Sequence, residues 1–141
     1  MMTSPASLAR SASEDDRANV LDRRDAAERL LQRAQYLAPH DRLLLEQIYR
    51  HGLSVADVAR LLNDRPRTLQ RRVKRLLTRL NDPLFRFVAG RLEMLPRDMQ
   101  TTARLVVLEG KALRDTARST GLTLHRVRQH LDAVRTLARH A

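Results

Sequence analysis

The feature that most constrains the fold is an internal repeat at a separation of 58 residues. Laid over itself at this offset, the chain matches glycine with glycine, apolar residues with apolar ones and turn formers with turn formers, and it needs no gap. Both copies space their apolar residues by three and four, as one face of a helix does. The repeat therefore predicts one helix–turn–helix unit present twice. The coinciding pairs are Leu37 and Leu95, Gly52 and Gly110, Val55 and Leu113, Asp57 and Asp115, Ala59 and Ala117, Asn63 and Gly121, Leu69 and Val127, Val73 and Leu131, and Leu76 and Val134.

Helical periodicity extends over most of the 141 residues. We predict helices at about 22–37, 40–51, 54–62, 66–81, 96–109, 112–120 and 123–139. Leu84–Val88 and Arg91–Leu95 are predicted as two short strands joined by a turn at Ala89-Gly90. The expected fold class is all-α, mainly helical, with one small β-hairpin wing and tandem helix–turn–helix units. The expected divisions are a disordered tail at 1–19, an N-terminal helix plus winged helix–turn–helix at 20–96, and a second helix–turn–helix at 97–141.

The first unit has the spacing that a helix–turn–helix needs. Ser54 and Asp57 form the pattern of a capping box, which starts a short helix. Ala59 is small enough for the next helix to cross closely, Asn63 tolerates the left-handed conformation of a tight turn, and Leu69 anchors the second helix. This packing leaves the opposite side of the second helix exposed, where it can enter the major groove of DNA.

The positive charge of the chain is concentrated after residue 64. Residues 1–64 carry 9 basic and 10 acidic residues, a net of −1, whereas residues 65–141 carry 18 basic and 6 acidic residues, a net of +12. Residues 65–81 hold seven of these cations and no acid. The asymmetry favours a densely negative partner, most often nucleic acid. Because nearly all the cations are arginines, the codon bias of a GC-rich bacterial genome is the other explanation.

One face of the helix predicted at 66–81 is suited to DNA. At 100° per residue, the apolar side centres near Val73 and Leu80, and basic residues lie opposite. Arginine suits guanine, glutamine suits adenine, and either Arg or Lys suits phosphate. Arg72 and Arg79 flank the apolar side and are expected to reach the backbone or an internal acid. A solvated basic surface is the alternative. The predicted DNA-binding residues here are Arg65, Arg67, Thr68, Gln70, Arg71, Lys74 and Arg75.

The second unit presents a weaker face, because Asp132 lies among its outward residues and would repel phosphates. Contact with DNA, with a partner protein or with a second copy of the chain all stay open for this unit. The residues predicted to reach DNA there are His125, Arg126, Arg128 and Gln129.

The stretch GLSVADVARLLNDRPRTLQRRVKRLLTRLNDPLFRFVAGRLEMLP resembles the winged helix–turn–helix of LysR-type transcriptional regulators. The resemblance covers about residues 40–96; DPLF is similar to the opening of that family's wing and Gly90-Arg91 to its turn, while Arg65 replaces a small cap residue. It implies that Arg86 and Arg91 contact the minor groove or phosphates; alternatively, the hairpin only covers the core. No effector domain is expected. Both units also resemble the helix–turn–helix of region 4 of bacterial sigma factors, without the region that melts promoter DNA.

Other classes of function find no support in the sequence. There is no cysteine, no glycine-rich phosphate loop and no nucleophile motif, so we expect no enzyme, no catalytic residue, no cofactor and no metal. The five histidines are expected at the surface or at helix ends. Only 3% of residues are aromatic, which disfavours recognition of RNA or single strands by base stacking. No apolar run is long enough to span a membrane, and the expected location is the cytoplasm, in association with the nucleoid.

The sequence therefore predicts sequence-specific binding of double-stranded DNA by a bacterial transcriptional regulator, with its recognition helix at about 66–81. The competing prediction is a sigma-region-4-like adaptor that binds RNA polymerase or another regulator and touches DNA weakly. A homodimer is compatible with either prediction.

Overall fold

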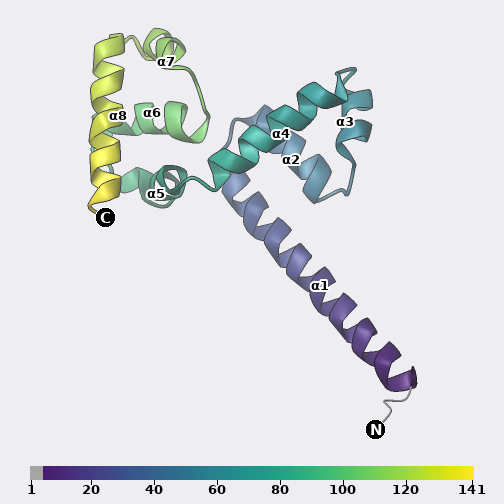
Figure 1. The fold of residues 1–141 in the computed structure, drawn as a ribbon. Helices are drawn as coiled ribbons and strands as arrows, with labels where there is room; N and C mark the ends of the chain where they lie inside the picture. Colours follow the sequence, from purple (N-terminus) through teal and green to yellow (C-terminus); the bar gives the residue numbers. More distant parts are fainter. Residues whose placement is uncertain (1–4) are drawn as a thin grey trace.

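The computed structural model describes the backbone of residues 5–141 and the side chains of residues 14–141. Its described part is mainly helical and contains no strand. α2, α3 and α4 form one group and α5 to α8 form another beside it, while α1 projects away from both (Figure 1). The elements are α1 (Pro5–Ala34), α2 (Pro39–Tyr49), α3 (Val55–Leu61), α4 (Pro66–Leu80), α5 (Pro83–Arg91), the 3-10 helix η1 (Leu92–Met94), α6 (Arg97–Thr102), the π-helix η2 (Ala103–Leu108), α7 (Leu113–Thr120) and α8 (Leu124–Arg139).

α1 extends further toward the N-terminus than the sequence predicts. Residues 5–19, where the sequence predicts a disordered tail, belong to this helix, and residues 1–4 lie outside the described residues. Every side chain from residue 14 to residue 26 is exposed, and α1 enters the core only near its end, where Ala34 is buried. Hydrophobic periodicity reports the packed part of a helix rather than its full length, which explains why the predicted helix began at Asp22.

The predicted β-hairpin wing is wrong, because α5 and η1 occupy its place. The Asp82 carboxylate caps α5 by accepting a hydrogen bond from the N–H of Leu84 at 2.8 Å, and the proline between them suits a first helical turn. Gly90 lies within the helix without a positive φ, so it makes no turn. Phe85 and Val88, three residues apart, are both buried, so this segment covers the core as a helix.

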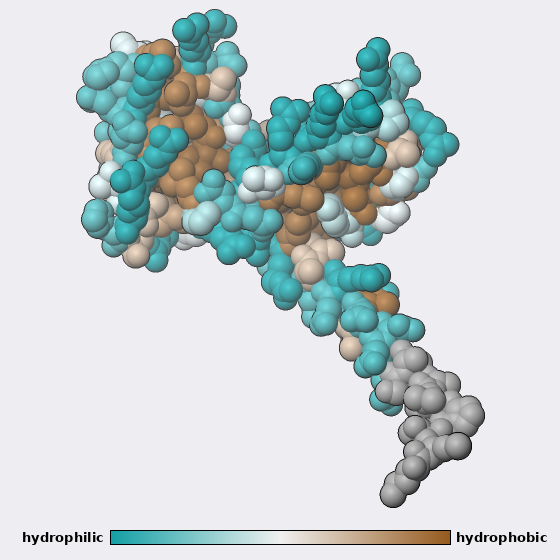
Figure 2. Space-filling view, viewed as in Figure 1, coloured by the Kyte–Doolittle hydropathy of each residue, from teal (hydrophilic) through white to brown (hydrophobic). Residues whose placement is uncertain are grey.

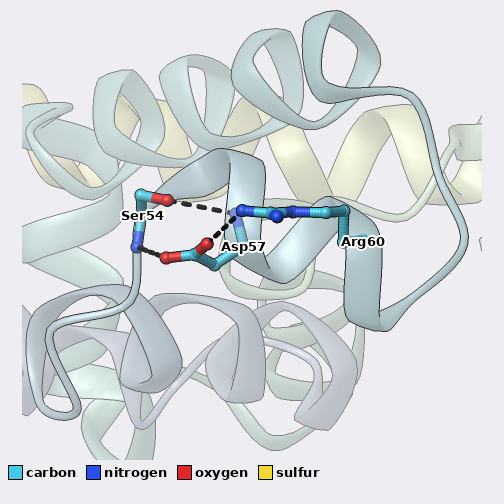
Figure 3. Close-up of polar contacts among 3 residues, drawn as sticks. All are labelled: Ser54, Asp57 and Arg60. Atoms are coloured by element: carbon cyan, nitrogen blue, oxygen red, sulfur yellow. Dashed lines mark hydrogen bonds and ion pairs between the residues drawn. The ribbon is translucent and has the colours of Figure 1, made fainter.

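The start of α3 has the predicted capping box. The Ser54 hydroxyl accepts a hydrogen bond from the N–H of Asp57 at 3.1 Å, and the Asp57 carboxylate accepts one from the N–H of Ser54 at 3.3 Å (Figure 3). Arg60 donates to the same carboxylate at 2.6 Å. Ser54, through its side chain first and its backbone second, and Arg60, through its charge, lower the pKa of Asp57.

Both units turn and pack at matching positions. Asn63 has a φ of +52° after α3, and Gly121 has a φ of +75° after α7, so both adopt the left-handed conformation. Leu69 on α4 and Val127 on α8 are completely buried, as expected of anchors. Three further pairs of the repeat are buried in both copies, and a hydrophobic cluster links the two groups of helices. These pairs are Leu37 and Leu95, Val73 and Leu131, and Leu76 and Val134.

Candidate nucleic-acid interface

α4 divides its side chains into an apolar face and a basic face. The apolar face packs on α2, α3 and the end of α1, and its leucines and valine are buried. Figure 2 shows a hydrophilic band along α4 beside the hydrophobic region beneath it. Proline at the first helical position allows the helix to begin directly after the turn, since no N–H is needed there. The buried residues are Leu69, Val73, Leu76 and Leu80.

Two arginines of α4 are held inside the unit by Asp41 of α2. Arg72 donates two hydrogen bonds to the Asp41 carboxylate, from Nε at 3.1 Å and from Nη2 at 2.6 Å. Arg79 approaches the other carboxylate oxygen at 3.8 Å. Burial lowers the pKa of Arg79 from its usual value, and the charge of Asp41 opposes that shift. The expectation that Arg72 and Arg79 reach an internal acid is confirmed.

The other cations of this segment face solvent. All seven residues predicted to bind DNA in the first unit are exposed, and none of their five cations forms an ion pair within the described residues. A groove runs along this face to the start of α5. Positive charge on the rim of a groove is what a phosphate backbone requires. The groove is lined by Arg71, Lys74, Arg75, Thr78, Arg79 and Asp82.

α8 holds the corresponding face of the second unit. The Thr123 hydroxyl caps it by accepting a hydrogen bond from the N–H of Arg126 at 3.1 Å. The four residues predicted to reach DNA here, His125, Arg126, Arg128 and Gln129, are exposed. Asp132 is also exposed and pairs with Arg135 at 3.7 Å, so positive and negative charge mix along α8. This face is less basic than that of α4.

Arg86 and Arg91, which the resemblance places in a wing, both lie on α5 and are exposed. The Arg91 guanidinium lies over the ring of Phe87, 5.3 Å from its centroid, in a cation–π contact. No wing is present in the described residues. The prediction that a wing carries these two arginines to the minor groove therefore has no structural basis.

His130 is the residue that sequence reasoning misplaced. It is buried rather than at the surface, on the inner side of α8. Its Nδ1 lies 3.1 Å from the hydroxyl of Thr102, and its Nε2 lies 3.8 Å from the carboxylate of Asp98. A position among the apolar residues of α8, three before Ala133 and four before Val134, could have signalled this burial. The contact joins α8 to α6.

Membrane-spanning helices and metal-ligating clusters are both absent from the described part of the chain. No helix there is both long enough and apolar enough to cross a membrane. No group of three metal-ligating side chains gathers within that part either.

Comparison with known proteins bears on the first unit alone. No curated protein and no solved structure matches the chain. A family model described as a helix-turn-helix domain matches residues 33–76, which run from the end of α1 through α2 and α3 into α4. Residues 33–76 thus form a helix–turn–helix domain, and the match supports DNA as its partner.

Proposed function

We propose that the chain binds duplex DNA sequence-specifically and acts as a bacterial transcriptional regulator without catalytic activity, with α4 as the recognition helix. The observation that carries the proposal is the division of α4. One face is buried, two arginines are tied to Asp41, and the remaining cations project together into solvent. A helix fixed on one side and basic on the other meets the geometric and electrostatic needs of the major groove.

Base reading would fall to the exposed residues in the first three turns of α4. Gln70 can form two hydrogen bonds with adenine, and Arg71 two with guanine. Arg65 and Arg67, at the start of the helix, would hold phosphates and fix the register. Lys74, further along the same face, would do the same as a point charge.

The second unit would supply less of the affinity, because Asp132 reduces the positive charge of α8. We propose that it reads a weaker flanking site on the same duplex. The tandem arrangement supports this role, since both units bury the same pairs of positions.

Selection of bound sequences from a random duplex pool tests sequence specificity. We expect enrichment of one motif by the full chain. In the same duplex and buffer, Arg71→Ala should weaken binding by about 1–3 kcal/mol, roughly 5- to 150-fold, and Arg126→Ala distinctly less. Both variants should melt like the wild type, because both side chains are exposed. A larger loss for Arg126→Ala would reverse the roles of the two helices, and no loss for either would refute both.

A protein-binding adaptor is the second candidate, favoured by the mixed charge of α8. It would bind RNA polymerase or another regulator through this helix. An adaptor should bind duplex DNA with little dependence on sequence. Two results together would favour this function: the selection enriches no motif, and the chain binds RNA polymerase.

A further inference from the structure

Gly110 lies directly against an arginine from the other unit. It follows η2 and has a φ of +70°. A Cβ at this position would overlap Nη1 of Arg79 and lie 2.6 Å from its Cζ, closer than such atoms approach in proteins. Arg79 is on the last turn of α4, the recognition helix of the first unit. The guanidinium of the first unit therefore lies next to the backbone between η2 and α7 of the second unit.

Arg79 makes few direct polar contacts in this place. Its side chain is 27% exposed, and its Nη2 is 3.8 Å from the Asp41 carboxylate. Neither Nε nor Nη2 has a hydrogen-bond partner among the described residues. The contact of Arg79 with Asp41 is therefore a long ion pair rather than a hydrogen bond. The Arg79 guanidinium lies between Asp41 of α2 and Gly110 of the second unit. This position points to a role in setting how the two units are placed relative to each other.

Gly52 provides the internal comparison for Gly110. The two glycines coincide in the repeat, and their φ values are +69° and +70°. A Cβ at Gly52 would meet nothing within 4 Å. Both positions favour glycine for the turn, and at Gly110 a side chain would in addition displace the Arg79 guanidinium.

We propose that the Arg79–Gly110 contact positions the second unit relative to α4, so that the chain recognises a bipartite duplex with one fixed spacing. This inference rests on the proposed function. Two binding units on a rigid body favour the one separation that matches their geometry, whereas loosely joined units tolerate many. On duplex DNA, an insertion of about five base pairs also turns the second half to the opposite side. Spacing dependence is therefore the property that this contact should control.

The first experiment measures dissociation constants for the selected duplex and for versions with one to six base pairs inserted between its halves. For the wild type, an insertion of about five base pairs should weaken binding at least about 10-fold. Gly110→Ala should flatten this dependence to within about 3-fold while keeping the affinity for the isolated first half. Arg79→Met should flatten the dependence on spacing to the same extent, and its affinity for the first half is compared separately because Arg79 also lines the groove of α4. Gly52→Ala, which introduces the same backbone strain without the contact, should keep the wild-type profile. If Arg79 only stabilised the fold, Arg79→Met would weaken binding to every duplex by the same factor and leave the dependence on spacing unchanged.

A second experiment needs no DNA. The chain has no cysteine, so Ala56→Cys on α3 and Arg114→Cys on α7, both exposed, can carry spin labels. The distance distribution between them should be narrow in the wild type and in Gly52→Ala, and broad in Gly110→Ala and Arg79→Met. Distributions of equal width in all four proteins, or an unchanged spacing profile in the two contact variants, would overturn the inference. Failure of the wild type to bind any duplex, with the broadening still present, would refute the proposed function separately.

Discussion

The salt dependence of DNA binding can be worked out from the cations that α4 leaves free. Seven cations occupy residues 65–81, and two of them are committed to Asp41. Five exposed cations remain. Each cation that displaces condensed counterions from the phosphates contributes about −0.9 to the slope of log K against log salt. Arg71 is counted with the others, because its charge lies between the phosphate strands even when it reads a guanine, so five cations give a slope of about −4.5. Affinity should then fall about 500-fold between 50 and 200 mM salt.

The double variant Arg71→Gln/Arg75→Gln removes two of these contacts. The slope should fall to about −2.7, and the loss of affinity over the same salt range to about 40-fold. Arg17→Gln/Arg23→Gln is the matched control, because it changes the net charge equally at exposed positions on the projecting part of α1. Fluorescence anisotropy on one duplex at five salt concentrations gives each slope. Equal slopes for the two double variants would show that total charge, rather than the face of α4, governs binding.

Further predictions concern the stability of the units. Leu69→Asp and Val127→Asp should each cost at least about 3 kcal/mol, because both side chains are completely buried, and thermal melting would register the loss. Ser54→Ala should cost about 1 kcal/mol through loss of the helix cap, which urea denaturation at pH 7 can measure. The lowered pKa of Asp57 means that its stabilising effect is present above its ordinary pKa of 3.8 and is lost as pH falls through the lower folded value. Asp57→Asn should therefore remove the part of the pH dependence of unfolding that lies below pH 3.8. Asp41→Asn should cost about 1–3 kcal/mol, because two arginines of α4 lose their carboxylate partner, and chemical denaturation would detect it.

The helices and their buried sides could be predicted from the sequence because they depend on local spacing. Leu69, Val73 and Leu76 recur at three and four residues, and that spacing alone determines which side of α4 faces the core. The capping box needs only Ser54 and a carboxylate three residues later. The same local reasoning separated the two committed arginines of α4 from the exposed ones, because they flank the apolar side.

The wing was mispredicted because its sequence carries two conflicting local signals. Phe85, Phe87 and Val88 favour strands, and Gly90 next to them is typical of a turn. The spacing of Phe85 and Val88 favours a helix instead, and Asp82 followed by proline is a helix start. In a segment of nine residues, burial of the helical face of α5 against η2, α8 and α4 decides between these signals. That burial depends on residues far away in the chain, which a local reading does not include.

Contacts between distant segments show what the repeat preserves. Arg72 and His130 occupy the same position in the two units. One is an arginine and the other a histidine, so this pair is not part of the apolar pattern that reveals the repeat. Each joins the long helix of its unit to an earlier helix of the same unit: Arg72 on α4 binds Asp41 on α2, while His130 on α8 contacts Thr102 and lies near Asp98 on α6. The repeat therefore keeps the place of a polar contact and changes its chemistry. The arginine needs a full carboxylate partner, whereas the histidine is satisfied at one nitrogen by a neutral hydroxyl. The charge available to a polyanion is set by other residues: five exposed cations along α4 in the first unit, and an exposed face in the second that includes Asp132. DNA-binding measurements should therefore find most of the affinity in the first unit.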